Sequence, residues 1–118
     1  MGGLIDFGLV DESLDSDTHL IALRGEVDAH SATRLGSRLF GLAEDGTRRV
    51  IVDLSDVTFI DSTGLGVLLN ALRHFSLRHA RVALVCPTER VLRPFQVTGL
   101  VRRLPIFENR DLALAGVA

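Results

Sequence analysis

The chain has 118 residues, 13 basic and 15 acidic side chains, a formal net charge of −2 and 47% hydrophobic residues. This length and composition predict one globular domain with a real core. The balanced charge excludes the basic stripe expected of a protein that binds nucleic acid directly. Because no apolar run approaches the roughly eighteen residues that span a bilayer, and no signal peptide is recognisable, we expect a cytoplasmic protein without membrane contact.

Two residue types narrow the chemistry further. All 13 basic residues are arginines, and lysine is absent from the sequence. A P-loop needs its lysine and a Schiff-base enzyme needs an amine, so both classes are excluded. Cys86 is the single cysteine, which excludes an internal disulfide and a cysteine zinc cluster, and we expect it to be a buried small hydrophobe.

The first half of the chain predicts two strands, a helix and a third strand. Residues 4–10 and 19–23 read as strands of a hairpin, since Ser and Asp residues that favour turns lie between them. Apolar residues at helical spacing predict a helix over about 31–43, with Asp28 and Ser31 as caps and Gly46 as terminator. Residues 49–54 form an apolar, β-branched run typical of a strand buried on both faces.

The second half alternates helices and strands. Apolar positions three and four residues apart predict a second helix over about 65–75, and a fourth strand follows at 81–85. A third helix begins near residues 87–89 and ends before Gly99, and Pro94 should kink or shorten it because proline cannot donate to the carbonyl of Arg90. A last strand at 104–107 and an Asn109-capped helix over about 110–115 complete the chain.

This order of elements predicts an α/β fold. We expect a mixed, mostly parallel sheet of about five strands, with an N-terminal hairpin strand added antiparallel at the edge and about four helices. There are no internal repeats, so residues 1–118 read as a single domain. In such sheets functional loops gather at the carboxyl ends of the strands, which here selects residues 25–30 and 61–66.

The hexapeptide at 61–66 is the most informative feature of the sequence. Asp61 and Ser62 lie where a helix N-cap belongs, next to backbone N–H groups that are unpaired and partly positive. Capping alone is the ordinary explanation of such residues. However, three capping side chains stand where one would do, and Gly64 and Gly66 weaken the first helical turn while leaving the backbone open to close approach by another molecule.

Four segments together carry a family resemblance. They are Gly25-Glu26-Val27-Asp28, the stretch from Val50 to Ser55, the stretch from Val57 to Gly66, and Phe95-Gln96-Val97-Thr98-Gly99-Leu100. In order and spacing they closely resemble the bacterial anti-sigma factor antagonists, which are single STAS domains. The similarity extends over about residues 4–107.

The resemblance implies a phosphorylation switch. Ser62 is then the residue phosphorylated by a partner anti-sigma factor that acts as an ATP-binding serine kinase, with Thr63 as the second choice of acceptor. The unphosphorylated protein binds the anti-sigma factor and frees the sigma factor, phosphorylation breaks that complex, and a serine phosphatase resets it. The partner-facing surface is implied to comprise Asp28 together with Asp61, Ser62, Thr63, Gly64, Leu65 and Gly66. The protein would be a substrate and binding partner with no catalysis, cofactor or metal of its own.

Three other functions can be weighed against this switch. A phospho-aspartate receiver would use Asp53 with Glu26 and Asp28, but it lacks the required lysine, and Asp53 is better suited to capping the adjoining loop. A ligand-sensing STAS domain would bind a nucleotide or another anion at the N-terminus of the second helix.

The third alternative is an enzyme, for which the sequence offers little. The histidines show no metal-ligand spacing, and no general base is evident for Ser62. Structural or surface roles are therefore expected for His19, His30, His74 and His79. The expected oligomeric state is a monomer.

Overall fold

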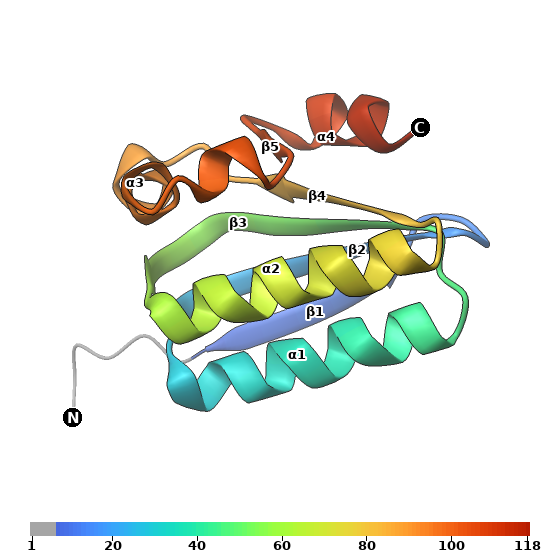
Figure 1. The fold of residues 1–118 in the computed structure, drawn as a ribbon, viewed down its shortest axis with the longest axis horizontal. Coiled ribbons are helices and arrows are strands. Elements are labelled where there is room, and N and C mark those ends of the chain that lie inside the picture. Colours follow the sequence, from blue (N-terminus) through green and yellow to red (C-terminus); the bar gives the residue numbers. More distant parts are fainter. Residues whose placement is uncertain (1–6) are drawn as a thin grey trace.

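The computed structural model describes residues 7–118, which form a five-stranded sheet flanked by helices (Figure 1). The elements are β1 (Gly8–Ser13), β2 (Thr18–Val27), α1 (Ala29–Glu44), β3 (Arg49–Ile60), α2 (Ser62–Leu77), β4 (Arg81–Val85), α3 (Glu89–Val97), the 3-10 turn η1 (Leu100–Arg102), β5 (Ile106–Phe107) and α4 (Arg110–Val117). The strand order is β1-β2-β3-β4-β5; β1 is antiparallel to β2, and the other neighbours are parallel. The predicted α/β fold with an antiparallel edge strand is confirmed. Between residues 7 and 118, no helix combines the length and apolarity needed to cross a membrane.

The central strands are buried on both faces, as their apolar sequences predict. In β3, Val50, Val52 and Leu54 join the main core beneath α1 and α2. The intervening Ile51 points to the opposite face and packs with Ala113 of α4 in a second cluster. Figure 1 shows the same arrangement, with α1 and α2 on one side of the sheet and α4 on the other. The alternation of the strand therefore places one helical layer on each face.

Several boundaries differ from the sequence prediction. β1 runs from Gly8 to Ser13 instead of 4–10, and residues 4–6 of that prediction lie outside the described part of the chain. β3 continues past residue 54 to Ile60, because its second half also pairs with β2. In this second half only Val57 and Ile60 are buried. That half is half-exposed and lacks the continuous apolar run that marked the first half. The extension matters because it carries the chain directly into the 61–66 loop.

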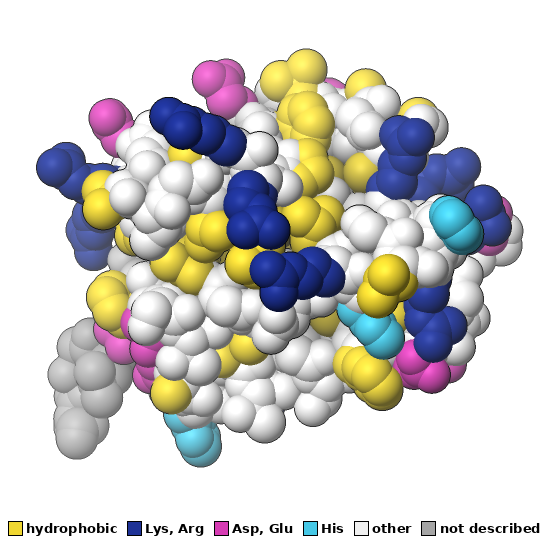
Figure 2. All heavy atoms as spheres, in the orientation of Figure 1, with side chains coloured by type: hydrophobic (Ala, Val, Ile, Leu, Met, Phe, Trp, Pro, Cys, Tyr) yellow, Lys and Arg dark blue, Asp and Glu magenta, His cyan; other side chains and the backbone are white. Residues whose placement is uncertain are grey.

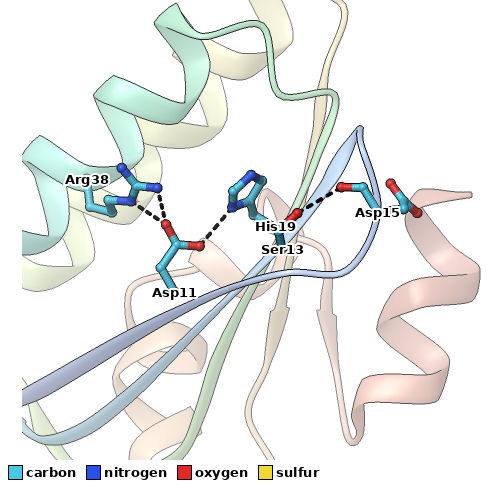
Figure 3. A network of polar contacts seen from close by, with 5 residues as sticks. All are labelled: Asp11, Ser13, Asp15, His19 and Arg38. Carbon is cyan, nitrogen blue, oxygen red and sulfur yellow. Dashed lines mark hydrogen bonds and ion pairs between the residues drawn. The ribbon is translucent and has the colours of Figure 1, made fainter.

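The edge strand β1 is held by a polar network that joins three elements (Figure 3). One carboxylate oxygen of Asp11 lies 2.8 Å from Nδ1 of His19 on β2, and the other pairs with the guanidinium of Arg38 on α1. Burial alone would raise the pKa of Asp11, but the hydrogen bonds from His19 and Arg38 lower it below its usual value. The ionised carboxylate thus ties β1 to both the sheet and α1.

Pro94 lies inside the third helix, which is not shortened relative to its predicted end before Gly99. The helix is nine residues long and continues past Pro94 to Val97, although proline cannot donate to the carbonyl of Arg90. Val91 and Phe95 are buried on its inner face and anchor it to the main core. Packing therefore compensates for the lost backbone hydrogen bond.

Candidate functional site

The two segments selected from the sequence, 25–30 and 61–66, meet at the carboxyl end of the sheet. They are shorter connections than predicted, because β2 runs to Val27, α1 begins at Ala29 and α2 begins at Ser62, which leaves Asp28 and Asp61 as the connecting residues. Val27 at the end of β2 is the register partner of Ile60 at the end of β3. One residue further on, the N–H of Asp61 donates to the carbonyl of Val27 at 3.1 Å. The starts of α1 and α2 are consequently held side by side.

Asp28 is the N-cap of α1. Its Oδ1 accepts hydrogen bonds from the N–H groups of His30 and Ser31, each at 3.0 Å. Ser31 reciprocates, since its Oγ accepts from the Asp28 N–H at 2.9 Å and donates to the carbonyl of Glu26 at 2.8 Å. The hydrogen bond from the Ser31 N–H lowers the pKa of Asp28, so this carboxylate is ionised near neutral pH. The predicted cap is confirmed, with Ser31 completing a capping box.

Asp61 is the N-cap of α2 and accepts a hydrogen bond from the N–H of Gly64 at 3.0 Å. Because Asp61 holds the cap position, Ser62 becomes the first residue of the helix, and its side chain is exposed. Thr63 follows and is exposed as well. One acid therefore does the capping, and two hydroxyl groups remain at the surface of the positive end of the helix.

Gly64 and Gly66, near the start of α2, have different surroundings. A Cβ on Gly64 would lie 2.8 Å from Cγ1 of Ile60, 2.9 Å from Cγ1 of Val27 and 3.0 Å from the carbonyl oxygen of Val27. The close approach at Gly64 is thus made by the protein's own strands, which differs from the expected approach by another molecule. A Cβ on Gly66 would meet nothing within 4 Å. Gly64 and Leu65 are buried, and Gly66 is half-buried.

Asp53 lies away from this loop pair and is committed to structural contacts. Its Oδ1 accepts from the N–H of Ser55 at 2.9 Å. Because β3 continues to Ile60, Ser55 lies within the strand, so the prediction that Asp53 caps an adjoining loop is wrong. Its Oδ2 accepts from Nε of Arg110 at 2.6 Å, a contact with α4 that the sequence did not reveal. Burial alone would raise the pKa of Asp53, but hydrogen bonds from Ser55 and Arg110 lower it. The carboxylate is 5% exposed and anchors α4 instead of facing solvent as a phosphoacceptor would.

Comparison with known proteins agrees with this geometry. The family model described as "STAS domain" matches residues 13–113. An anti-sigma-B factor antagonist of Staphylococcus aureus is 28% identical over 92 residues, which cover 78% of this chain and 85% of that protein.

Solved structures share the fold over most of its length. An anti-sigma factor antagonist from Mycobacterium paratuberculosis is 26% identical with a TM-score of 0.80, and the match covers 95% of this chain and 94% of that one. The Bacillus cell fate determinant SpoIIAA in its phosphorylated form has the same fold, with a TM-score of 0.73, 22% identity and coverage of 94% and 100%. Since the family model spans most of the sequence and the strand order and loop geometry fit it, this chain belongs to the STAS domain family.

Proposed function

We propose that this chain is an anti-sigma factor antagonist controlled by phosphorylation of Ser62. In its unphosphorylated form it binds an anti-sigma factor and thereby frees a sigma factor; phosphorylation ends that binding. The observation that carries the proposal is the exposed Ser62 hydroxyl at the N-terminus of α2, next to its cap Asp61 and beside the start of α1. The similarity to anti-sigma-B factor antagonists supports the same assignment.

Ser62 is well placed as an acceptor for a kinase. Its side chain is exposed and stands outside the capping hydrogen bond, which Asp61 makes with Gly64. Thr63, also exposed, is the second choice of acceptor. A phosphate on Ser62 brings about −1.5 to −2 charges to the end of the helix that best tolerates them, so phosphorylation need not unfold α2.

The effect of the phosphate should fall on the partner. Asp28 and Asp61 already give the loop pair two carboxylates, and Glu26 nearby is exposed. Added negative charge raises both the repulsion within this surface and the cost of drying it in a packed contact. Loss of association therefore follows from local electrostatics without a change of fold.

Some residues of the proposed partner-facing surface are accessible to a partner, and others support them from beneath. Asp28, Asp61, Ser62, Thr63 and Gly66 are accessible to a partner, whereas Gly64 and Leu65 lie beneath them and hold the turn against β2 and β3. In this function the protein has no catalytic role: the anti-sigma factor is the ATP-binding serine kinase, and a cytoplasmic serine phosphatase removes the phosphate.

Binding of the anti-sigma factor by Ser62 variants tests the proposal. The wild type and Ser62→Ala should bind the ATP-binding anti-sigma factor encoded near this chain with similar affinity, and Ser62→Asp should bind at least about tenfold more weakly. Isothermal titration calorimetry measures all three. Thr63→Asp is a matched control for charge at the next position and should have a smaller effect. Equal affinities for the wild type and Ser62→Asp would refute the switch.

A further inference from the structure

A groove of about 390 Å³ lies beside the candidate site, between the end of β3 and helix α3. Phe59 and Ile60 of β3 form one wall, and Pro94 and Val97 of α3 form the other. Arg90 and Arg93 stand at its rim as the charged residues of the lining. In Figure 1, α3 lies at the same end of the molecule as the start of α2.

The groove presents apolar surface to solvent. Phe59 is 50% exposed and Val97 is 77% exposed, although both are large hydrophobic side chains. Such residues are unremarkable when scattered, but here two of them face a single depression. Aromatic side chains that become buried when a partner binds are typical of the residues that contribute most to binding between proteins.

The charges at the rim indicate what kind of surface fits. Nη2 of Arg90 donates to the carbonyl of Thr58 at 3.3 Å, which holds this guanidinium against the end of β3. Arg93 is exposed and forms no ion pair with any of residues 7–118. Two arginines beside an apolar depression favour a partner that offers carboxylates around an apolar side chain.

The groove is continuous with the proposed partner-facing loops. Thr58, Phe59 and Ile60 of its lining lead directly to Asp61 and Ser62 in the chain. In Figure 2 arginine and hydrophobic side chains lie around α3 together with acidic ones, and further acidic side chains lie below them where α1 and α2 begin. The charged residues of the groove lining are thus both arginines, whereas the caps of the neighbouring helices, Asp28 and Asp61, are acids.

We propose that this groove is a second docking element for the anti-sigma factor and receives a segment with an apolar side chain flanked by Asp or Glu. The proposal rests on the function proposed above and adds the chemistry of the partner. Arginines in the groove and acids at the helix caps favour one orientation of the partner, because reversal would oppose like charges. A second copy of this chain fits poorly, since a two-fold contact through the groove would bring arginines against arginines.

The test measures the dissociation constant of the anti-sigma factor for two groove variants and two controls. The groove variants are Phe59→Ser and the double variant Arg90→Glu/Arg93→Glu. Phe40→Ser removes another exposed aromatic, 56% exposed on α1. Arg48→Glu/Arg81→Glu reverses two exposed arginines at the amino ends of β3 and β4, opposite to the end that carries the groove. Thermal unfolding of each variant checks that it is folded, and Val97→Asp replaces any groove variant that is not.

The groove variants should each weaken binding by at least about tenfold, while the controls stay within about twofold. The loss in the arginine variant should shrink as salt rises from about 50 to 500 mM, because part of it is steering between exposed charges. If the groove variants bind the anti-sigma factor as tightly as the wild type does, the docking role is overturned and the Ser62 switch still stands. Absence of wild-type binding overturns the function itself. The wild type could also form a dimer that the groove variants disrupt, while their binding to the anti-sigma factor is unchanged. That result assigns the groove to a second copy of the chain and also overturns the proposal.

Discussion

At the scale of single residues, the two capping acids combine an observed role with a proposed one. Asp28 and Asp61 satisfy the N–H groups of α1 and α2, and the same carboxylates face the proposed partner surface. Capping depends on the side-chain oxygen, whereas repulsion or attraction across an interface depends on the charge. A substitution that keeps the side-chain oxygen and removes the charge should therefore preserve stability while changing binding.

Asp28 allows such a substitution. Asparagine caps helices about as well as aspartate, so Asp28→Asn should keep the melting temperature while weakening the anti-sigma factor complex. Asp28→Ala removes the cap as well and should lower the melting temperature and weaken binding. Differential scanning fluorimetry and titration calorimetry on the same samples measure the two effects. Unchanged affinity in Asp28→Asn would remove this carboxylate from the partner surface.

Gly64 and Gly66 of α2 make a matched pair for stability. A side chain on Gly64 would collide with Val27 and Ile60, so Gly64→Ala should lower the free energy of unfolding by about 1 to 3 kcal/mol. Gly66 has open space around its Cβ position and lies in the helix, so Gly66→Ala should be neutral or stabilise by up to about 1 kcal/mol. Urea denaturation of both variants checks this. Equal effects would mean that α2 does not pack as closely on β2 and β3 as described.

At the scale of elements, β3 organises the molecule. Its first half is the buried centre of the sheet, and its second half leads into residues 61–66. Between the two halves Asp53 reaches Arg110, which lies 57 residues along the chain and fixes the start of α4. The apolar pattern of β3 is readable from the sequence, but a contact over that separation is not, because no local spacing connects the two residues.

The link between Asp53 and Arg110 should be visible as a pH-dependent stability. Because the folded pKa of Asp53 is lowered, its stabilisation is fully present above about pH 4, the unfolded value, and is lost as the pH falls through the folded pKa. Arg110→Ala should therefore cost about 1 to 2 kcal/mol at pH 7, the lower end being favoured since solvent screens the half-exposed arginine. The difference from the wild type should shrink at about pH 3. Urea denaturation at both pH values measures it; a difference independent of pH would mean that Arg110 acts by packing alone.

At the scale of the whole molecule, repeated alternation of strand and helix patterns was sufficient to predict the fold class and the edge strand. Cys86 is buried as expected, and burial raises its pKa to about 11. The Asp11 network and the groove beside α3 could not be predicted, because each joins side chains from elements that only the folded chain brings together. The loop residues were identifiable from sequence, but the internal packing of Gly64 was not.

The proposed switch predicts that a negative charge at residue 62 leaves the fold, the stability and the oligomeric state of the protein unchanged. Ser62→Asp should keep the circular dichroism spectrum and the melting temperature within a few degrees of the wild type, because an acid at a helix N-terminus is tolerated. Size-exclusion chromatography with light scattering should give a monomer of 12.8 kDa for both proteins. Unfolding or self-association of Ser62→Asp would mean that the charge acts on the fold, contrary to a surface switch.

The central claim is that Ser62 accepts phosphate from the anti-sigma factor, and one measurement tests it directly. The protein is incubated with ATP and the ATP-binding anti-sigma factors encoded near it, and intact mass is followed by peptide mapping. The account predicts a single added phosphate on Ser62 that is absent from Ser62→Ala. Phosphate at another residue, or none with any of these kinases, would contradict it.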